Sequence, residues 1–91
     1  MGMVGPMGTE TDLAQTFAAR CAQARAYLRN EMNQRGLREK DGWRIAETIR
    51  AIGTRTELVM RPIHLHLPAP DGLECVVEID EDETIESNCT P

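Results

Sequence analysis

The sequence predicts an α+β fold, in which one long N-terminal helix packs on a three-stranded antiparallel β-meander. Apolar residues recur at helical spacing in the first third of the chain, and two runs of alternating residues follow around a turn rich in Pro and Gly. At 91 residues, the chain is expected to form one domain with a small core. We divide it into a flexible N-terminal arm (1–8), a single α+β domain (9–80) and an acidic C-terminal tail (81–91).

The predicted helix covers residues 10–35. Its apolar positions recur at steps of four and three, which is the spacing of one helix face: Leu13, Phe17, Cys21, Ala24, Leu28 and Met32. Thr9 and Asp12 have the spacing of an N-terminal capping pair. Gly36 then provides the residue at which a left-handed helix end is least costly.

Residues 43–50 fit two templates. As a strand, the segment places Trp43, Ile45 and Ile49 on one face, whereas a helix would use Asp41 as its N-cap and Gly53 at its C-terminal end. Its Trp, Ile and Thr content favours the strand. The predicted order is therefore αβββ, with ααββ as the alternative.

The clearest local pattern is a hairpin over residues 56–80. Its odd positions are largely apolar and its even positions carry histidine and carboxylate side chains. A loop at residues 69–71 would place Leu65 opposite Cys75 in the core. The same register would place His66 opposite Glu74 on the outer face.

The charges are segregated along the chain. Residues 20–61 hold all ten cations and five anions, whereas residues 62–91 hold eight anions and no Lys or Arg. We expect the acidic end to partner the basic segment in part. The net charge of -5 argues against general nucleic-acid binding, and no apolar run is long enough to span a membrane.

The cysteines predict a reduced protein. Cys21, Cys75 and Cys89 are odd in number and lack metal-type spacing, and no secretory leader precedes them. We therefore expect a cytoplasmic location, with Cys21 and Cys75 as core thiols. No nucleophile and base are expected on one face, so the sequence predicts no enzyme.

Two sets of candidate site residues follow from the predicted elements. His64 and His66 would point to one side of a strand with Glu74 opposite, which is a candidate site for Zn or another divalent metal, and no other cofactor is expected. An ordinary polar outer face is the interpretation that we favour over metal binding. Arg25, Arg29 and Arg35 on the helix are candidate partner-binding residues.

The function expected from these features is a small cytoplasmic protein-binding or regulatory module without catalytic activity. A small core and exposed sheet edges favour a homodimer, so the expected partners are a second copy and an unidentified protein. The alternatives are a divalent-metal-binding protein that uses the His-x-His pair and a nucleic-acid-associated regulator that uses the helix arginines.

Overall fold

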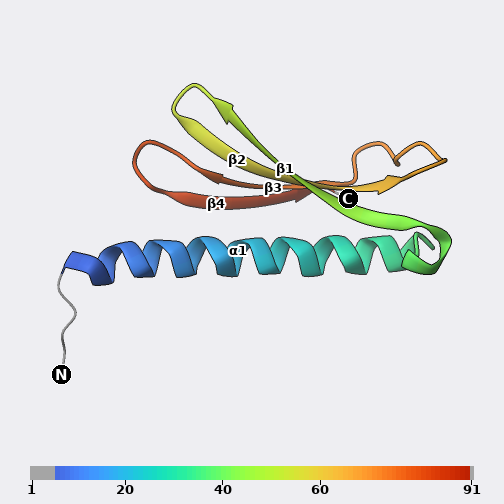
Figure 1. The fold of residues 1–91 in the computed structure, drawn as a ribbon, viewed down its shortest axis with the longest axis horizontal. Helices are drawn as coiled ribbons and strands as arrows, with labels where there is room; N and C mark the ends of the chain where they lie inside the picture. The colour runs from blue at the N-terminus through green and yellow to red at the C-terminus, as the bar shows by residue number, and fades with distance from the viewer. Residues whose placement is uncertain (1–5, 91) are drawn as a thin grey trace.

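One helix lies across a four-stranded antiparallel sheet in the computed structural model, which describes residues 6–90 (Figure 1). The elements follow in this order: α1 (Pro6–Gln34), a 3-10 turn η1 (Glu39–Asp41), β1 (Trp43–Ile52), β2 (Arg55–His64), β3 (Glu74–Ile79) and β4 (Ile85–Thr90). The strands lie in the order β1-β2-β3-β4, each antiparallel to its neighbour. The α+β class is confirmed, but the predicted count of three strands is wrong.

Helix α1 presents the predicted apolar face to the sheet. Cys21, Ala24, Leu28 and Met32 are buried, and Phe17 packs against them from an earlier turn. The helix begins at Pro6, earlier than expected, so residues 6–8 belong to it and the rest of the predicted arm lies outside the described residues.

The helix ends as the sequence predicts. The N–H of Leu37 donates to the carbonyl of Met32 at 2.8 Å, and the N–H of Gly36 donates to that of Asn33 at 3.2 Å. These two bonds define a Schellman motif, in which Gly36 takes the left-handed conformation at φ 77°. Leu37 is thereby folded back against the core.

Segment 43–52 is a strand, so the αβ order is confirmed and the helical alternative is wrong. Its partner residues in β2 run without interruption from Trp43 opposite His64 to Ile52 opposite Arg55. Trp43 is buried in the core, and Ile45 packs against it from the same face. The hairpin closes through Gly53 and Thr54, which lie between the paired residues Ile52 and Arg55.

The predicted register between β2 and β3 is wrong by an odd number of residues. Met60, and not Leu65, lies opposite Cys75, and Leu58 lies opposite Val77. Leu58, Val59 and Met60 are all buried, so alternation could not show which of them faces the helix. The structure buries Leu58 and Met60 under α1, and Leu65 in the following loop is 86% exposed.

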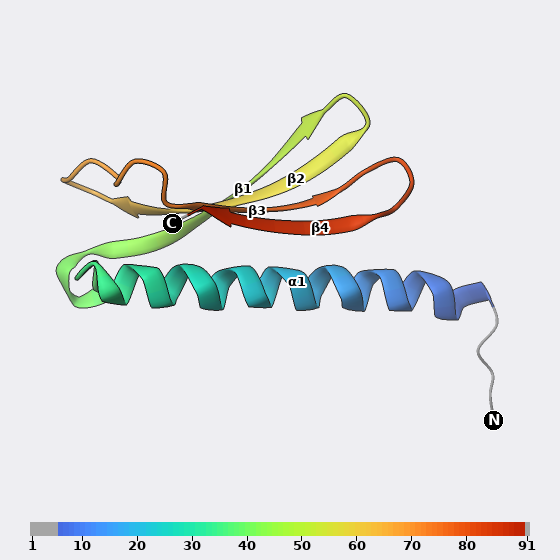
Figure 2. The same ribbon diagram turned by 180° about the vertical axis from the view of Figure 1, so that it is seen from behind.

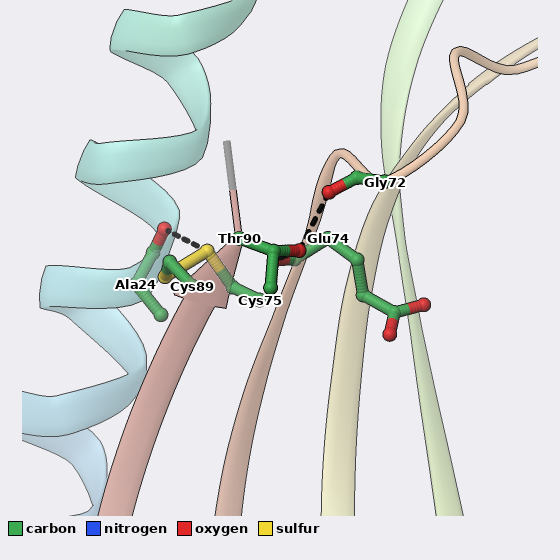
Figure 3. Close-up of a disulfide and its surroundings, with 6 residues drawn as sticks. All are labelled: Ala24, Gly72, Glu74, Cys75, Cys89 and Thr90. Carbon is green, nitrogen blue, oxygen red and sulfur yellow. Dashed lines mark hydrogen bonds between the residues drawn. A yellow bond between two sulfur atoms is a disulfide. The ribbon is translucent and has the colours of Figure 1, made fainter.

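The segment expected to be an acidic tail contains a strand. Strand β4 pairs with β3 along its whole length, and Cys75 lies directly opposite Cys89. The two sulfurs form a disulfide, so the expected reduced state of this pair is wrong, whereas Cys21 is a free buried thiol. Figure 3 shows the disulfide under α1, where Sγ of Cys75 lies 3.5 Å from the carbonyl oxygen of Ala24.

The end of β4 is also held by hydrogen bonds. The hydroxyl of Thr90 donates to the carbonyls of Gly72 at 2.6 Å and Glu74 at 3.2 Å (Figure 3). The sequence offers only Ile85 and Cys89 as apolar residues for this strand, and both are half-buried against the core. Because β4 has few apolar contacts with the core, the disulfide and the hydrogen bonds of Thr90 help to hold this strand in the sheet.

The helix covers one side of the sheet unequally. It packs on β2, β3 and β4, whereas β1 starts beside the end of α1 and rises away from it towards the hairpin turn (Figures 1 and 2). Ile49, on the same face of β1 as Trp43 and Ile45, is consequently 72% exposed. The face of β1 that carries Ile49 is therefore the least covered part of the sheet on the side of α1.

Reduction of the disulfide should lower the free energy of unfolding by about 2 to 4 kcal/mol, because Cys75 and Cys89 close a loop with a sequence separation of 14. Urea unfolding with and without a phosphine reductant measures the difference. The double variant Cys75→Ala/Cys89→Ala is the control, since it should no longer respond to the reductant. Equal wild-type unfolding curves in both conditions would contradict the prediction.

Candidate anion-binding cleft

A cleft of about 480 Å³ opens where the end of α1, the η1 turn and the start of β1 meet. Its apolar lining consists of Met32, Leu37, Trp43 and Ile45. Met32 and Trp43 are buried core residues, and the other two pack against that core. The cleft therefore has an apolar floor that is continuous with the hydrophobic core.

Four cations surround this floor: Arg29, Arg38, Lys40 and Arg44. Glu39 is the one acidic residue in the lining. No side chain in the described part of the chain forms an ion pair with any of the four cations within 4.0 Å. We call this site the basic cleft, and its lining carries a net charge of +3 from four cations and one anion.

Arg44 holds the rim of the basic cleft in place. Its Nη1 donates to the carbonyl of Glu39 at 3.0 Å and to the carbonyl of Trp43 at 2.8 Å. The guanidinium thereby ties the η1 turn to β1 and retains donors on its other nitrogens. Its positive charge is not neutralised by these carbonyls, so it remains available to an anion.

Behind the cleft, His64 is a structural residue. Its ring packs edge-on against Trp43, with centroids 4.9 Å apart, and its Nε2–H donates to the carbonyl of Asp41 at 2.7 Å. The N–H of His66 donates to Nδ1 of the same ring at 2.9 Å. Both nitrogens of His64 are thus engaged, which fixes the ring as the Nε2–H tautomer.

The structure brings two of the three predicted metal ligands together, because the ring centroids of His64 and His66 lie 6.2 Å apart, but Glu74 does not join them. His64 lies on the helix side at the end of β2, His66 lies in the loop after it, and Glu74 lies opposite Thr90 of β4 instead of opposite His66. Among the residues that the structure describes, no group of three His, Cys, Asp or Glu side chains is placed to hold a metal ion. The predicted register placed Glu74 opposite His66, whereas the observed register does not.

The predicted partner-binding arginines divide into two kinds. Arg25 forms a two-point ion pair with Glu47 of β1, with Nε–Oε2 and Nη2–Oε1 distances of 2.5 and 3.1 Å. Arg35, just after the end of α1, pairs with Glu31 of the last turn at 3.8 Å. Hydrogen bonding to Arg25 lowers the pKa of Glu47. Arg29 alone of the three lines the basic cleft.

The other members of the cleft were missed because they come from segments without periodicity. Arg38 and Lys40 lie in the short polar segment between α1 and β1, and Arg44 alternates with the apolar residues of β1. A local signal existed, since Arg38, Lys40 and Arg44, three of the four basic residues between 34 and 45, lie close to Trp43 in the sequence. This clustering in the sequence did not show that the side chains would surround one cleft.

A second charged cluster lies on the face of the sheet away from α1. Glu57, Glu78 and Glu86 stand directly opposite one another on β2, β3 and β4, with Arg50 of β1 at the end of the row. Glu57 is buried and pairs with Arg50 at 2.7 Å. Loss of hydration raises the pKa of Glu78, Arg55 opposes this rise, and hydrogen bonding to Glu86 adds to it.

The free thiol gives no sign of reactivity. Burial raises the pKa of Cys21, and Arg25 lowers it to a smaller extent. A thiol that stays protonated is a weak nucleophile. The helix of the described chain is also not long and apolar enough to cross a membrane.

Comparison of the chain with protein-family models, curated proteins and solved structures finds no match. The geometry of the basic cleft is therefore the feature from which a function can be inferred.

Substitution of Gly42 by Ala should destabilise the cleft. Gly42 has φ 102°, and a Cβ there would lie 2.9 Å from Nε2 of His64. Gly36→Ala is the matched control, because Gly36 also has a positive φ but open space around it. We expect about 1 to 2 kcal/mol of destabilisation for the control and about 1 to 3 kcal/mol more for Gly42→Ala, measured by urea unfolding. Equal losses would show that the contact with His64 has no energetic role.

Replacing Glu86 by Gln should raise the melting temperature at pH 7. An acid whose pKa is raised by folding favours the folded state at low pH, and that contribution is lost as pH rises through the folded pKa. Glu86→Gln removes a charge that raises the pKa of Glu78, so the gain should be present at pH 7 and should vanish near pH 3. Glu81→Gln removes the same charge from the β3–β4 turn and is the control. A gain that is independent of pH would contradict this assignment.

Proposed function

We propose that this chain is a small protein-binding module without catalytic activity, which takes an acidic side chain or terminal carboxylate of a partner into the basic cleft. The single observation that carries the proposal is the set of four cations around an apolar floor without ion-pair partners among the described residues. Arginine and lysine are suited to carboxylates, and Trp43 supplies a flat apolar wall. The volume lies within the range of ordinary ligand sites.

The acidic end of the chain does not neutralise these cations. One of the ion pairs, Arg55 with Glu78, joins the basic segment to the acidic one. The turn that carries Asp80, Glu81, Asp82 and Glu83 lies at the far end of the long axis from the η1 turn (Figure 1). Since no carboxylate in the described part of the chain pairs with these cations, the proposal takes the anion from another molecule.

The homodimer predicted from the sequence remains part of the proposal. Strands β1 and β4 are the outer strands of the sheet, so each has an unpaired edge in the described part of the chain. Light scattering checks this point: the proposed mass is about twice the 10.2 kDa of one chain.

The cytoplasmic location also remains a proposal. Disulfides persist chiefly in oxidising compartments, so the Cys75–Cys89 bond is the feature against which this location has to be tested. Thiol labelling of the protein in its native cells, before lysis, distinguishes a reduced pair from an oxidised one.

Neutralising two cations of the cleft should weaken binding of an acidic ligand by about tenfold, equivalent to about 1.4 kcal/mol. The variant is Arg38→Gln/Lys40→Gln, the probe is a short glutamate-rich peptide, and the signal is the fluorescence of Trp43, the single tryptophan of the chain. Affinity should also fall as salt is added.

The matched control is Arg20→Gln/Arg61→Gln, which removes the same charge from residues outside the basic cleft. Its affinity for the peptide should stay close to that of the wild type. An equal loss of affinity in both double variants would show that only the net charge of the chain matters. Unchanged affinity in both would reject the cleft as the binding site.

A further inference from the structure

Strand β1 is long for a strand at the edge of a sheet. It pairs with β2 over all ten of its residues, and no strand of the described chain lies along its other side. We propose that the acidic segment of the partner binds in extended form as a fifth strand along this edge and places its acidic side chain in the basic cleft. This inference rests on the proposed function and specifies how the partner is held.

The edge and the cleft are continuous. Trp43 and Ile45 are the first and third residues of β1, and both line the basic cleft together with Arg44 between them. A chain that hydrogen-bonds along β1 therefore reaches the cleft at the start of this strand. Backbone hydrogen bonds would supply affinity along the edge, while the cleft would supply selectivity for an anion.

Strand β1 also lacks the usual protection of a sheet edge. Natural edge strands are commonly blunted by lysine, proline, bulges or short length. The ten residues of β1 include no Lys or Pro, and its partners in β2 follow without a bulge. Of its three charged residues, Glu47 and Arg50 are engaged with Arg25 and Glu57, and Arg44 lines the basic cleft, where an acidic segment would meet it.

An exposed apolar residue extends the proposed contact beyond the cleft. Ile49 faces the same side of the sheet as Ile45 and is 72% exposed, because α1 does not cover this part of β1. An added strand that alternates apolar and polar residues would cover Ile49 with its apolar face. The fitting partner is therefore an acidic segment with alternating apolar residues.

Charge favours a foreign acidic segment over the β1 strand of a second copy. Strand β1 carries Arg44, Arg50 and Glu47, a net charge of +1, so the β1 strand of a second copy would bring further positive charge to the basic cleft. An acidic partner instead complements the net charge of +3 in the cleft lining.

The test is a titration of the full chain followed by Trp43 fluorescence. The probe is a short peptide that alternates valine and serine and carries glutamate at one end. Its matched form is N-methylated at alternate residues, which keeps the side chains and removes the backbone N–H donors that a fifth strand needs. Glutarate is the probe for the cleft alone.

We expect the unmodified peptide to bind about tenfold more tightly than the N-methylated peptide, a difference of about 1.4 kcal/mol. Ile49→Ser should weaken the unmodified peptide severalfold without changing the affinity of glutarate. Ile63→Ser is the control, because Ile63 is also exposed, at 44%, but lies on the other face of the sheet.

The outcomes separate the two proposals. Binding of glutarate and of both peptides with equal affinity would overturn strand addition while leaving the cleft as an anion site. Failure of all three probes to bind would reject the cleft itself. Light scattering in which the chain self-associates and the peptide dissociates it would replace the foreign segment by a second copy and overturn this choice of partner.

Discussion

The packing of a single helix on a four-stranded sheet determines the rest of this structure. A helix is about 10 to 12 Å wide with its side chains, whereas four strands spaced about 4.8 Å apart extend over about 14 Å between the outer backbones. Helix α1 therefore covers β2, β3 and β4, and β1 diverges from it after the first residues. The exposed Ile49 results from this incomplete cover, and the basic cleft opens where β1 leaves the end of α1.

Features set by neighbouring residues were predictable from the sequence. The helix face from Phe17 to Met32 and the left-handed Gly36 depend on local spacing and conformation, and both are present. The register of β2 was not predictable, because Leu58, Val59 and Met60 offer an apolar residue to either face. Only contact with α1 decides between them.

The candidate site was less accessible to prediction than the fold. Strand β4 carries little apolar signal, and its disulfide becomes visible only when the β3–β4 register places Cys89 opposite Cys75. Of the predicted partner-binding residues, Arg29 lines the cleft, whereas Arg25 and Arg35 have partners of their own. Which cations lack a partner is a property of the three-dimensional arrangement.

The two outer strands differ in how they would bear mechanical load. Strand β4 is bonded to β3 through sulfur next to its C-terminal end, so a force applied at Thr90 passes directly into the interior of the sheet. Such a force cannot peel β4 away residue by residue beyond Cys89. Strand β1 has no covalent bond of this kind: hydrogen bonds and the Arg50–Glu57 ion pair join it to β2, and one ion pair joins it to α1, so mechanical unzipping of the sheet would start from its side.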